Sequence, residues 1–411
     1  MKLKSFEIRS YRSCIKTGFP LHPELTGLIG INSAGKSNIL NALLLLRKRG
    51  RSRYVPARER DASCNKCFIS AELKHEKKTI YMKGEIIFET DERNFDEIQY
   101  TGLKWNFREF TNNAEWLKFP IDSDLFPTYA HLGYTKNLSK QHYYQIFPKS
   151  KKDRDILQKS QHLLAKVDSF FNGISYYSAS QFSDPSRCPV SIELEENRLL
   201  RRTRSFAGHE QFILDLYRTW KAQDKFYKRY LSTVGGEGIG LIDNIDFTEV
   251  EMPSNSCKVL SGGKTRIIER SRLLIVPIFS VYGNKLSPNQ LSEGTFKTLA
   301  LLFYVLTDES KLLLIEEPEV CIHHGLLSSI ISLIKTQSKQ KQIIISTHSD
   351  FVLDQLSPEN LILVKRQKKT GTMAKPLSKS MSSNDYRVLR RYLEESGNLG
   401  EYWREGGFAD E

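Results

Sequence analysis

The amino-acid sequence predicts an α/β fold with a mixed β-sheet, an antiparallel β-subdomain and a helical insertion. Near the start of the chain, the apolar pair Leu28-Ile29 leads through a glycine-rich turn into the apolar stretch 38–46, which is the pattern of a strand, a loop and a buried helix. Near the other end, the runs 312–315 and 343–345 are short and wholly apolar, as strands buried on both faces are. We therefore expect one α/β core built from both ends of the chain.

The composition is that of an ordinary globular protein. Of 411 residues, 39% are hydrophobic and 27% are charged, and a chain of this length can hold two or three domain-sized units. No run of about 18 apolar residues occurs, so we expect no membrane span. Residues 1–8 alternate between charged and apolar types, which predicts a first strand rather than a signal peptide. Six scattered cysteines fit a reducing compartment, so we expect a cytoplasmic protein.

The glycine-rich turn Gly30–Ser37 fits the pattern G-x-x-x-x-G-K-[ST] of phosphate-binding loops, and its flanks supply the strand and helix that this motif requires. In such a loop, backbone N–H groups and the helix N-terminus bind phosphate oxygens, Lys36 reaches the β- and γ-phosphates, and the Ser37 hydroxyl binds Mg²⁺. The sequence therefore predicts a nucleotide-binding protein. The residues that we expect to bind the nucleotide here are Gly30, Asn32, Ser33, Gly35, Lys36, Ser37 and Asn38.

Three segments are expected. Residues 1–110 hold the first part of the core, in which the alternating stretches 68–73, 79–82 and 85–88 predict antiparallel strands. Residues 111–270 form a mainly helical, basic insertion, and residues 271–411 complete the core. The C-x-x-C pair Cys64 and Cys67 is either half of a zinc site or two thiols near the surface; the sequence offers no second ligand pair at zinc spacing.

Within the insertion, residues 208–232 carry apolar side chains at helical spacing and predict core packing. The net charge of +13, with basic clusters at 149–154 and 198–204, fits either a polyanionic partner or a solvated basic surface. Gln181 follows the strand-like segment 174–179 and either senses Mg²⁺ and the γ-phosphate or is simply a polar loop residue.

Two stretches compete as a serine–glycine signature that presents a helix N-terminus to a phosphate. The segment 260–264 (L-S-G-G-K) precedes strand-like residues, whereas 291–295 (L-S-E-G-T) precedes the apolar helical stretch 296–306. Because a phosphate is bound by a helix N-terminus, only the second stretch fits, and it assigns the role to Ser292 and Gly294. The first stretch is expected to be a turn.

Polar side chains follow both C-terminal buried strands. Glu316 would order the Mg²⁺ shell together with Ser37, and Glu317 would polarise the attacking water. His348, which ends the next strand, would hydrogen-bond the γ-phosphate. We expect Glu316, Glu317 and His348 to be the catalytic residues.

The order of these motifs resembles that of the ABC/SMC-type ATPases. It is most similar to the RecF-like and OLD-like branch that is often labelled as AAA-type ATPases of phage-defence operons, and the resemblance covers roughly residues 1–50 and 270–411. It implies a P-loop NTPase with an ABC-ATPase head that uses ATP and Mg²⁺. Two features depart from the branch. Cys321 and His324 replace the glycine and proline of its E-x-G-L-H-P segment, and Glu316 stands where many relatives have aspartate.

The resemblance further implies a homodimer, or a higher even-numbered homo-oligomer, with ATP bound between subunits. Ser292 and Gly294 of one chain would then complete the site formed by Lys36, Ser37 and Glu317 of the other. The TOPRIM nuclease domain of OLD proteins has no counterpart in the roughly 60 residues after His348, and no other nuclease motif is present. The resemblance therefore implies an ATPase without nuclease chemistry of its own, similar to the ATPase subunits of Septu-like phage-defence systems. We expect it to regulate a separately encoded effector, which we expect to be a nuclease.

Two other functions stay open at this point. A RecF-like DNA-repair ATPase would bind DNA through its basic lobes in an ATP-dependent way. A nucleotide-binding subunit of a transporter is disfavoured by Asn38 after the G-K-S triplet, by the form of the signature at 291–295 and by the large insertion.

Overall fold

The computed structural model describes residues 1–47, 54–56, 66–90, 97–109, 117–121, 163, 166–167, 169–195, 208–223, 225–259, 265–395 and 397–408. The described chain forms two compact units. Unit 1 contains residues 1–176, 309–317 and 331–411, and unit 2 contains residues 177–308 and 318–330. This division into two units differs from the three consecutive segments expected from the sequence, because distant parts of the chain join in one sheet.

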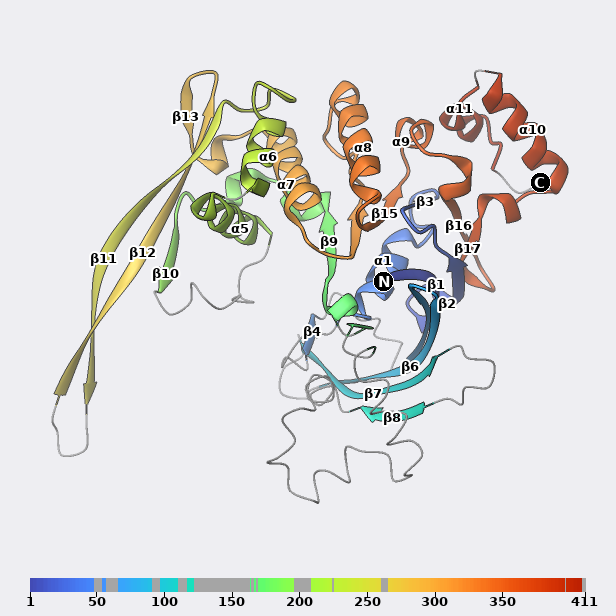
Figure 1. Cartoon of the computed structure of the whole chain (residues 1–411), viewed down its shortest axis with the longest axis horizontal. Helices are drawn as coiled ribbons and strands as arrows, with labels where there is room; N and C mark the ends of the chain where they lie inside the picture. The colour runs from blue at the N-terminus through green and yellow to red at the C-terminus, as the bar shows by residue number, and fades with distance from the viewer. Residues whose placement is uncertain are drawn as a thin grey trace. The chain divides into compact units, whose positions relative to one another are not determined.

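A six-stranded mixed sheet organises unit 1 (Figure 1). Its strands in spatial order are β17 (Gly371–Pro376), β16 (Leu361–Gln367), β3 (Leu25–Ile29), β15 (Gln342–Thr347), β14 (Leu312–Glu316) and β9 (Ile174–Ser178). The pairs β16–β3, β3–β15 and β15–β14 are parallel. Their register sets Glu316 beside Ser346 and Thr347 beside Ile29, so the carboxyl ends of three strands lie level. Ligands of open α/β sheets bind at this edge.

The remaining strands of unit 1 form an antiparallel sheet in the order β2-β1-β5-β6-β7-β4, with β8 paired to β7. Their bounds are β1 (Lys2–Tyr11), β2 (Cys14–Pro20), β4 (Tyr54–Pro56), β5 (Lys66–His75), β6 (Lys78–Thr90), β7 (Glu97–Glu109) and β8 (Leu117–Ile121). The predicted first strand and antiparallel subdomain are confirmed. Residues 79–82 and 85–88 belong to one strand, β6, because Lys83 and Gly84 stay paired with β5.

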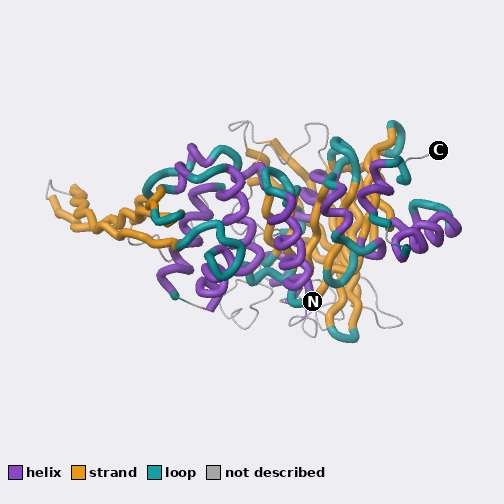
Figure 2. Tube along the Cα trace, turned by 90° about the horizontal axis from the view of Figure 1, so that it is seen from above, coloured by secondary structure: helices purple, strands orange, loops and turns teal. Residues whose placement is uncertain are grey.

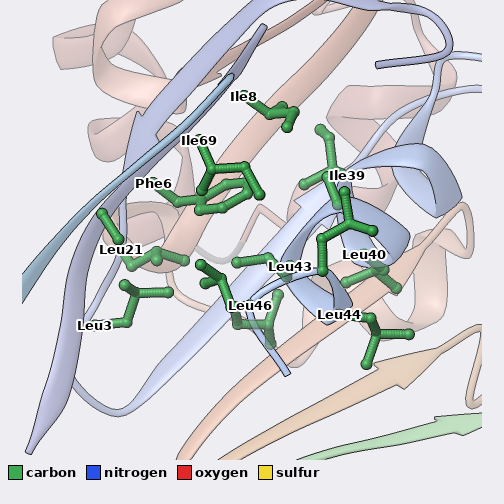
Figure 3. Packing of buried hydrophobic residues seen from close by; sticks show 14 of the residues in the cluster. Leu3, Phe6, Ile8, Leu21, Ile39, Leu40, Leu43, Leu44, Leu46 and Ile69 are labelled. Carbon is green, nitrogen blue, oxygen red and sulfur yellow. The ribbon is translucent and has the colours of Figure 1, made fainter. Parts of the chain in front are cut away.

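Helix α1 (Lys36–Leu44) joins the two sheets through a shared apolar core. It buries Ile39, Leu40 and Leu43, whose spacing places them on the side of the helix that faces the sheets. Figure 3 shows these side chains meeting Phe6 of β1 and Ile69 of β5 in one cluster. The strand and helix expected on either side of the glycine-rich turn are thus confirmed, and both are anchored in the core.

Among the described residues, five helical elements follow β15 in sequence and belong to the C-terminal part of unit 1. Its elements are α9 (Asp350–Asp354), η7 (Pro358–Asn360), η8 (Leu377–Lys379), α10 (Ser383–Glu394) and α11 (Leu399–Arg404). Helix α11 lies against α9, where the Gly400 N–H donates to Asp354 Oδ1 at 2.6 Å and Arg404 pairs with Asp350 at 3.2 Å.

Unit 2 combines helices with a long antiparallel hairpin. Its elements are η3 (Ala179–Phe182), η4 (Pro185–Arg187), β10 (Ile192–Glu195), α5 (His209–Ala222), α6 (Lys225–Val234), β11 (Asn244–Val259), β12 (Thr265–Val281), β13 (Asn284–Leu286), η6 (Pro288–Gln290) and α7 (Glu293–Thr307). Strands β11 and β12 pair side by side along a long ribbon (Figure 2), and β10 and β13 pair with β12 in the same four-stranded sheet. Helix α8 (His324–Ser338) begins in unit 2 and ends in unit 1.

The predicted helical stripe at 208–232 is confirmed as α5 and α6, with Phe212, Leu216 and Tyr230 buried. The described part of 111–270 also contains the strands β8 to β11 and the start of β12, so this segment is not mainly helical where it is described. Alternation rather than helical spacing governs 244–259, which explains the difference.

Some sequence features lie outside the described residues. They are Cys64, the basic clusters at 149–154 and 198–204, and the turn expected at 260–264.

Candidate nucleotide-binding site

The phosphate loop connects the end of β3 to the start of α1. Two of its residues have positive φ, Ser33 at 66° and Gly35 at 106°, and such left-handed residues turn successive N–H groups toward one side. Gly35 is the N-cap of α1, so the positive end of the helix dipole faces the loop. Lys36 is only 6% exposed, and its Nζ donates to the carbonyl oxygens of Gly30 at 2.7 Å and Ile31 at 3.2 Å. The loop is therefore folded around the lysine ammonium.

Two glycines of the loop are required for different reasons. A Cβ atom at position 30 would lie 2.3 Å from the carbonyl oxygen of Val364, so close approach of β16 excludes any side chain there. Gly35 combines its positive φ with a Cβ position 2.1 Å from Thr372 Oγ1. The geometry fits a phosphate group, because inward N–H groups, a helix N-terminus and a buried ammonium are together the donor set that phosphate needs.

A chain of hydrogen bonds braces this loop. The Thr372 hydroxyl donates to Ala34 O at 3.1 Å, so the 2.7 Å contact between Thr372 and Ser13 has the Ser13 hydroxyl as donor. Ser13 Oγ accepts from Asn38 Nδ2 at 2.7 Å, and Asn38 Oδ1 accepts from Arg12 at 3.3 Å. We call Arg12, Ser13, Asn38, Thr372 and Ala34 the brace. Of the side chains in the brace, the phosphate-loop pattern predicted only Asn38, because Arg12, Ser13 and Thr372 are distant from the loop in sequence.

A hollow of about 650 Å³ opens beside the loop, within the range of small-ligand sites. Its lining includes the exposed apolar side chains of Ile15 and Ile31 and the cationic side chains of Arg12, Arg366 and Lys368. Apolar surface suits a nucleobase and cations suit phosphates, so the hollow can take the rest of a nucleotide whose phosphates lie in the loop.

The predicted catalytic residues lie at the ends of the neighbouring strands. Glu316 ends β14, and Glu317 follows it with a φ of 49°, a left-handed conformation that is strained for glutamate. The Glu317 N–H donates to Ser346 O at 2.9 Å, which ties this turn to β15. His348 follows β15, and its Nδ1 lies 3.5 Å from Glu317 Oε1. Strain at such a position is typical of functional sites.

Glu316 makes a contact that the sequence did not predict. The Tyr176 hydroxyl, from the neighbouring strand β9, donates to Glu316 Oε2. Neither the residue nor its spacing matches a motif, so only the sheet order could reveal it.

Ser292 and Gly294 lie in unit 2, where they begin helix α7. Ser292 is the exposed N-cap and accepts from the Thr295 N–H at 3.2 Å, so the predicted helix cap is confirmed. A Cβ atom on Gly294 would lie 2.6 Å from the Cys321 carbonyl oxygen, which brings the loop Pro318–His323 against the helix start.

An ion pair between the buried Lys297 and the half-exposed Glu293 fixes the same helix start. The Lys297 side chain is 2% exposed, and its Nζ lies 2.7 Å from Glu293 Oε1 and 3.6 Å from Cys321 Sγ. Hydrogen bonding to Lys297 lowers the pKa of Glu293. We call residues 291–297 together with 318–323 the signature region. Cys321 itself has a φ of 65°, which explains why glycine suits this position in the family that the sequence resembles.

The remaining predicted residues are placed as follows. Asn32 and Ser33 line the hollow, and Ser37 is exposed in the first turn of α1. Gln181 lies in η3 with its side chain half-buried, and His324 begins α8. Cys67 is buried in β5, and the described residues contain no cluster of three or more histidine, cysteine or acidic side chains able to hold a metal. Mg²⁺ would instead be held by Ser37, Glu316 and the nucleotide phosphates, an arrangement with few protein ligands that suits this ion.

Among solved structures, the chain is similar to the SMC head domain from Thermotoga maritima, at 13% identity over 92% of this chain and 99% of that chain, with a TM-score of 0.41. It is also similar to an SMC head bound to the C-winged helix domain of ScpA (14% identity, 91% and 97% covered, TM-score 0.48). A third is an Smc head with an extended coiled coil bound to the C-terminal domain of ScpA derived from Pyrococcus furiosus (10% identity, 96% and 99% covered, TM-score 0.43).

No match is found among curated proteins. In the part of the chain that the structure describes, no helix is both long and apolar enough to cross a membrane. A family model does match, over residues 25–354, a range that includes the phosphate loop, the paired glutamates and His348. The chain therefore belongs to the AAA domain family that is described as "putative AbiEii toxin, Type IV TA system".

Proposed function

We propose that this protein binds and hydrolyses ATP with Mg²⁺ as an ABC/SMC-like ATPase subunit. The observation that carries the proposal is the common strand edge of unit 1, where the phosphate loop, the paired glutamates and His348 follow the parallel strands β3, β14 and β15. Lys36 would bind the β- and γ-phosphates, Ser37 and Glu316 would hold Mg²⁺, and Glu317 would polarise water. His348 would hydrogen-bond the γ-phosphate.

The active form would be a homodimer, or a higher even-numbered oligomer, with ATP between subunits. Support comes from the exposed Ser292 at the N-terminus of α7, since an exposed hydroxyl and helix dipole are suited to a phosphate supplied from outside the helix. ATP binding would then stabilise the assembly through linkage, and hydrolysis would release it.

The biological role would be anti-phage defence, in which the ATPase cycle regulates a separately encoded effector, expected to be a nuclease. The family description, which refers to a toxin of a toxin–antitoxin system, supports a role of this class. The second candidate, RecF-like ATP-dependent DNA binding, has the net charge of +13 in its favour.

The first experiment measures solution mass with and without Mg-ATP for Glu317→Gln, purified from its host. Because this substitution removes the water-polarising carboxylate but spares the phosphate loop, ATP should accumulate and drive even-numbered assembly. Lys36→Ala should stay in its nucleotide-free state, and co-purification of a second polypeptide would support the partnered role. Assembly without ATP in both variants contradicts the proposal, and ATP-dependent, salt-sensitive DNA retention favours the RecF-like alternative.

A mixing experiment tests whether the site is shared between chains. Lys36→Ala and Ser292→Arg should each be inactive as ATPases alone. In a mixed dimer, the Ser292→Arg chain still provides Lys36 and the Lys36→Ala chain still provides Ser292. One of the two shared sites is then intact, so mixing should restore activity. If mixing restores nothing although mixed dimers form, the two residues do not act in one shared site.

A further inference from the structure

The hydrogen bond from Tyr176 to Glu316 joins two strands of unit 1 at the edge where the nucleotide residues lie. The Tyr176 ring packs against the apolar cluster shared by α1, β1 and β5, so its position is set by the core. Its hydroxyl donates to Oε2 of Glu316 and leaves Oε1 for other partners. A carboxylate that accepts a hydrogen bond from an anchored phenol loses rotational freedom.

The hydrogen bond from Tyr176 offsets the greater side-chain freedom of a glutamate at position 316. Glutamate has one more rotatable bond than aspartate, so its carboxylate reaches further but is less well fixed at the end of a strand. Mg²⁺ requires strict octahedral geometry, so the oxygens that bind the ion or its water shell must be held in fixed positions. Tyr176 supplies the missing constraint from the adjacent strand.

The neighbouring tyrosine shows that the contact is specific to one position. Strand alternation sends Tyr177 to the opposite face, where burial raises its pKa and its hydroxyl donates to Lys297 O at 3.1 Å. The described residues also contain a second tyrosine–glutamate pair in unit 1, in which Tyr392 of α10 donates to Glu401 Oε2 of α11 at 2.7 Å. That pair belongs to the C-terminal helices and provides a matched control.

We propose that Tyr176 is a positioning residue that orients the Glu316 carboxylate for the Mg²⁺ shell of the bound nucleotide. This role rests on the proposed function, because it assumes that Mg-ATP binds at the phosphate loop. It predicts a defect confined to the magnesium dependence of binding, not a general loss of nucleotide affinity.

The test titrates Mg²⁺ against binding of a fluorescent ATP analogue, in a Glu317→Gln background that prevents turnover. Tyr176→Phe keeps the ring and removes the hydroxyl, so the Mg²⁺ concentration for half-maximal binding should rise about tenfold. Analogue binding in EDTA and the melting temperature should remain those of the parent. Tyr392→Phe should leave the Mg²⁺ dependence unchanged.

A double-mutant cycle adds a second test, in which Glu316→Asp breaks the hydrogen bond while Tyr176 remains. Aspartate is too short by one methylene to keep the hydrogen bond, so Tyr176→Phe should have no further effect in that background. An unchanged Mg²⁺ dependence in Tyr176→Phe, tighter Mg²⁺ coupling, or full additivity in the cycle would overturn the role of Tyr176. Failure of the parent to bind the analogue at all would overturn the proposed function as well, so the two failures are distinguishable.

Discussion

The phosphate loop in unit 1 and the signature region in unit 2 are both built on a helix N-terminus, but they are held in different ways. The loop is enclosed by its own structure, since Lys36 is buried against loop carbonyls and the brace ties α1 to β17 and to the β1–β2 turn. In the signature region, Ser292 is exposed, and the ion pair between the half-exposed Glu293 and the buried Lys297 fixes the helix start.

The two regions therefore suit different steps: the loop suits binding of a nucleotide, and the signature region suits contact with a phosphate that another chain holds. A braced loop presents its donors before any ligand arrives, which reduces the ordering cost of binding. An exposed cap on a rigid helix presents its hydroxyl outward, which suits a phosphate held by another chain. Substitutions in the first region should therefore change nucleotide affinity, and those in the second should change local stability or assembly.

The largest expected effect is that of Lys36→Ala on nucleotide affinity. Removal of a buried ammonium that charge-assists phosphate binding should weaken ATP binding at least about a hundredfold. Isothermal titration calorimetry measures the affinity, and Lys375→Ala, an exposed lysine of β17, is the control. Binding by Lys36→Ala within a few-fold of the parent would remove the loop from the site.

In the signature region, Glu293→Ala should destabilise α7 by about 2 kcal/mol, because it leaves the buried Lys297 ammonium without its carboxylate. Lys297→Met should cost less than about 1 kcal/mol, because the glutamate left behind is half exposed and can be hydrated. Native-state hydrogen exchange of the α7 amides measures both. Equal costs for the two substitutions would mean that the pair is not asymmetric.

The brace should contribute less than the lysine. Thr372→Ala removes the hydroxyl that joins Ser13 to the loop carbonyl of Ala34, and should weaken ATP binding about tenfold. Thr372→Ser should retain most of the affinity. Thr370→Ala, in which the hydroxyl contacts only Gln367 among the described hydrogen bonds, is the matched control and should bind ATP as the parent does.

A pH effect should be smaller and confined to the signature region. The pKa of Glu293 is lowered from its ordinary value of 4.5 in the folded state, so its ion pair stabilises the protein fully at a pH above 4.5. This stabilisation is lost as the pH falls from 4.5 through the lowered pKa. Thermal unfolding between pH 6 and pH 3 should therefore show a shallower acid decline for Lys297→Met than for the parent. Identical declines would show that the pair contributes nothing to acid sensitivity.

The smallest effect compares the left-handed residues of the two regions. Cys321→Gly should stabilise the protein by about 0.5 kcal/mol, since relief of strain at a φ of 65° exceeds the added entropy of the unfolded chain. Ser33→Gly at a φ of 66° should give a similar gain. Thermal unfolding measures both, and a loss of stability at Cys321 would mean that its contact with Lys297 outweighs the strain.

Local patterns were sufficient to predict the elements that carry the site. The strand, loop and helix around Gly30–Ser37, the buried strands that end at Glu316 and Thr347, and the Ser292 cap all follow from residues adjacent in sequence. Such features depend on backbone preferences and on apolar periodicity, which act over a few residues. The α/β class with an antiparallel subdomain followed from the same signals.

Contacts between distant segments were decided only by the tertiary structure. The partners Ser13 and Thr372 are 359 positions apart, and Tyr176 and Glu316 are 140 positions apart. Single serine, threonine and tyrosine residues carry no pattern that reveals such pairing, because strand order and register decide which side chains meet. Motifs of adjacent residues thus indicated which groups could bind phosphate and magnesium, whereas strand order and register in the folded chain establish which side chains hold those groups in place.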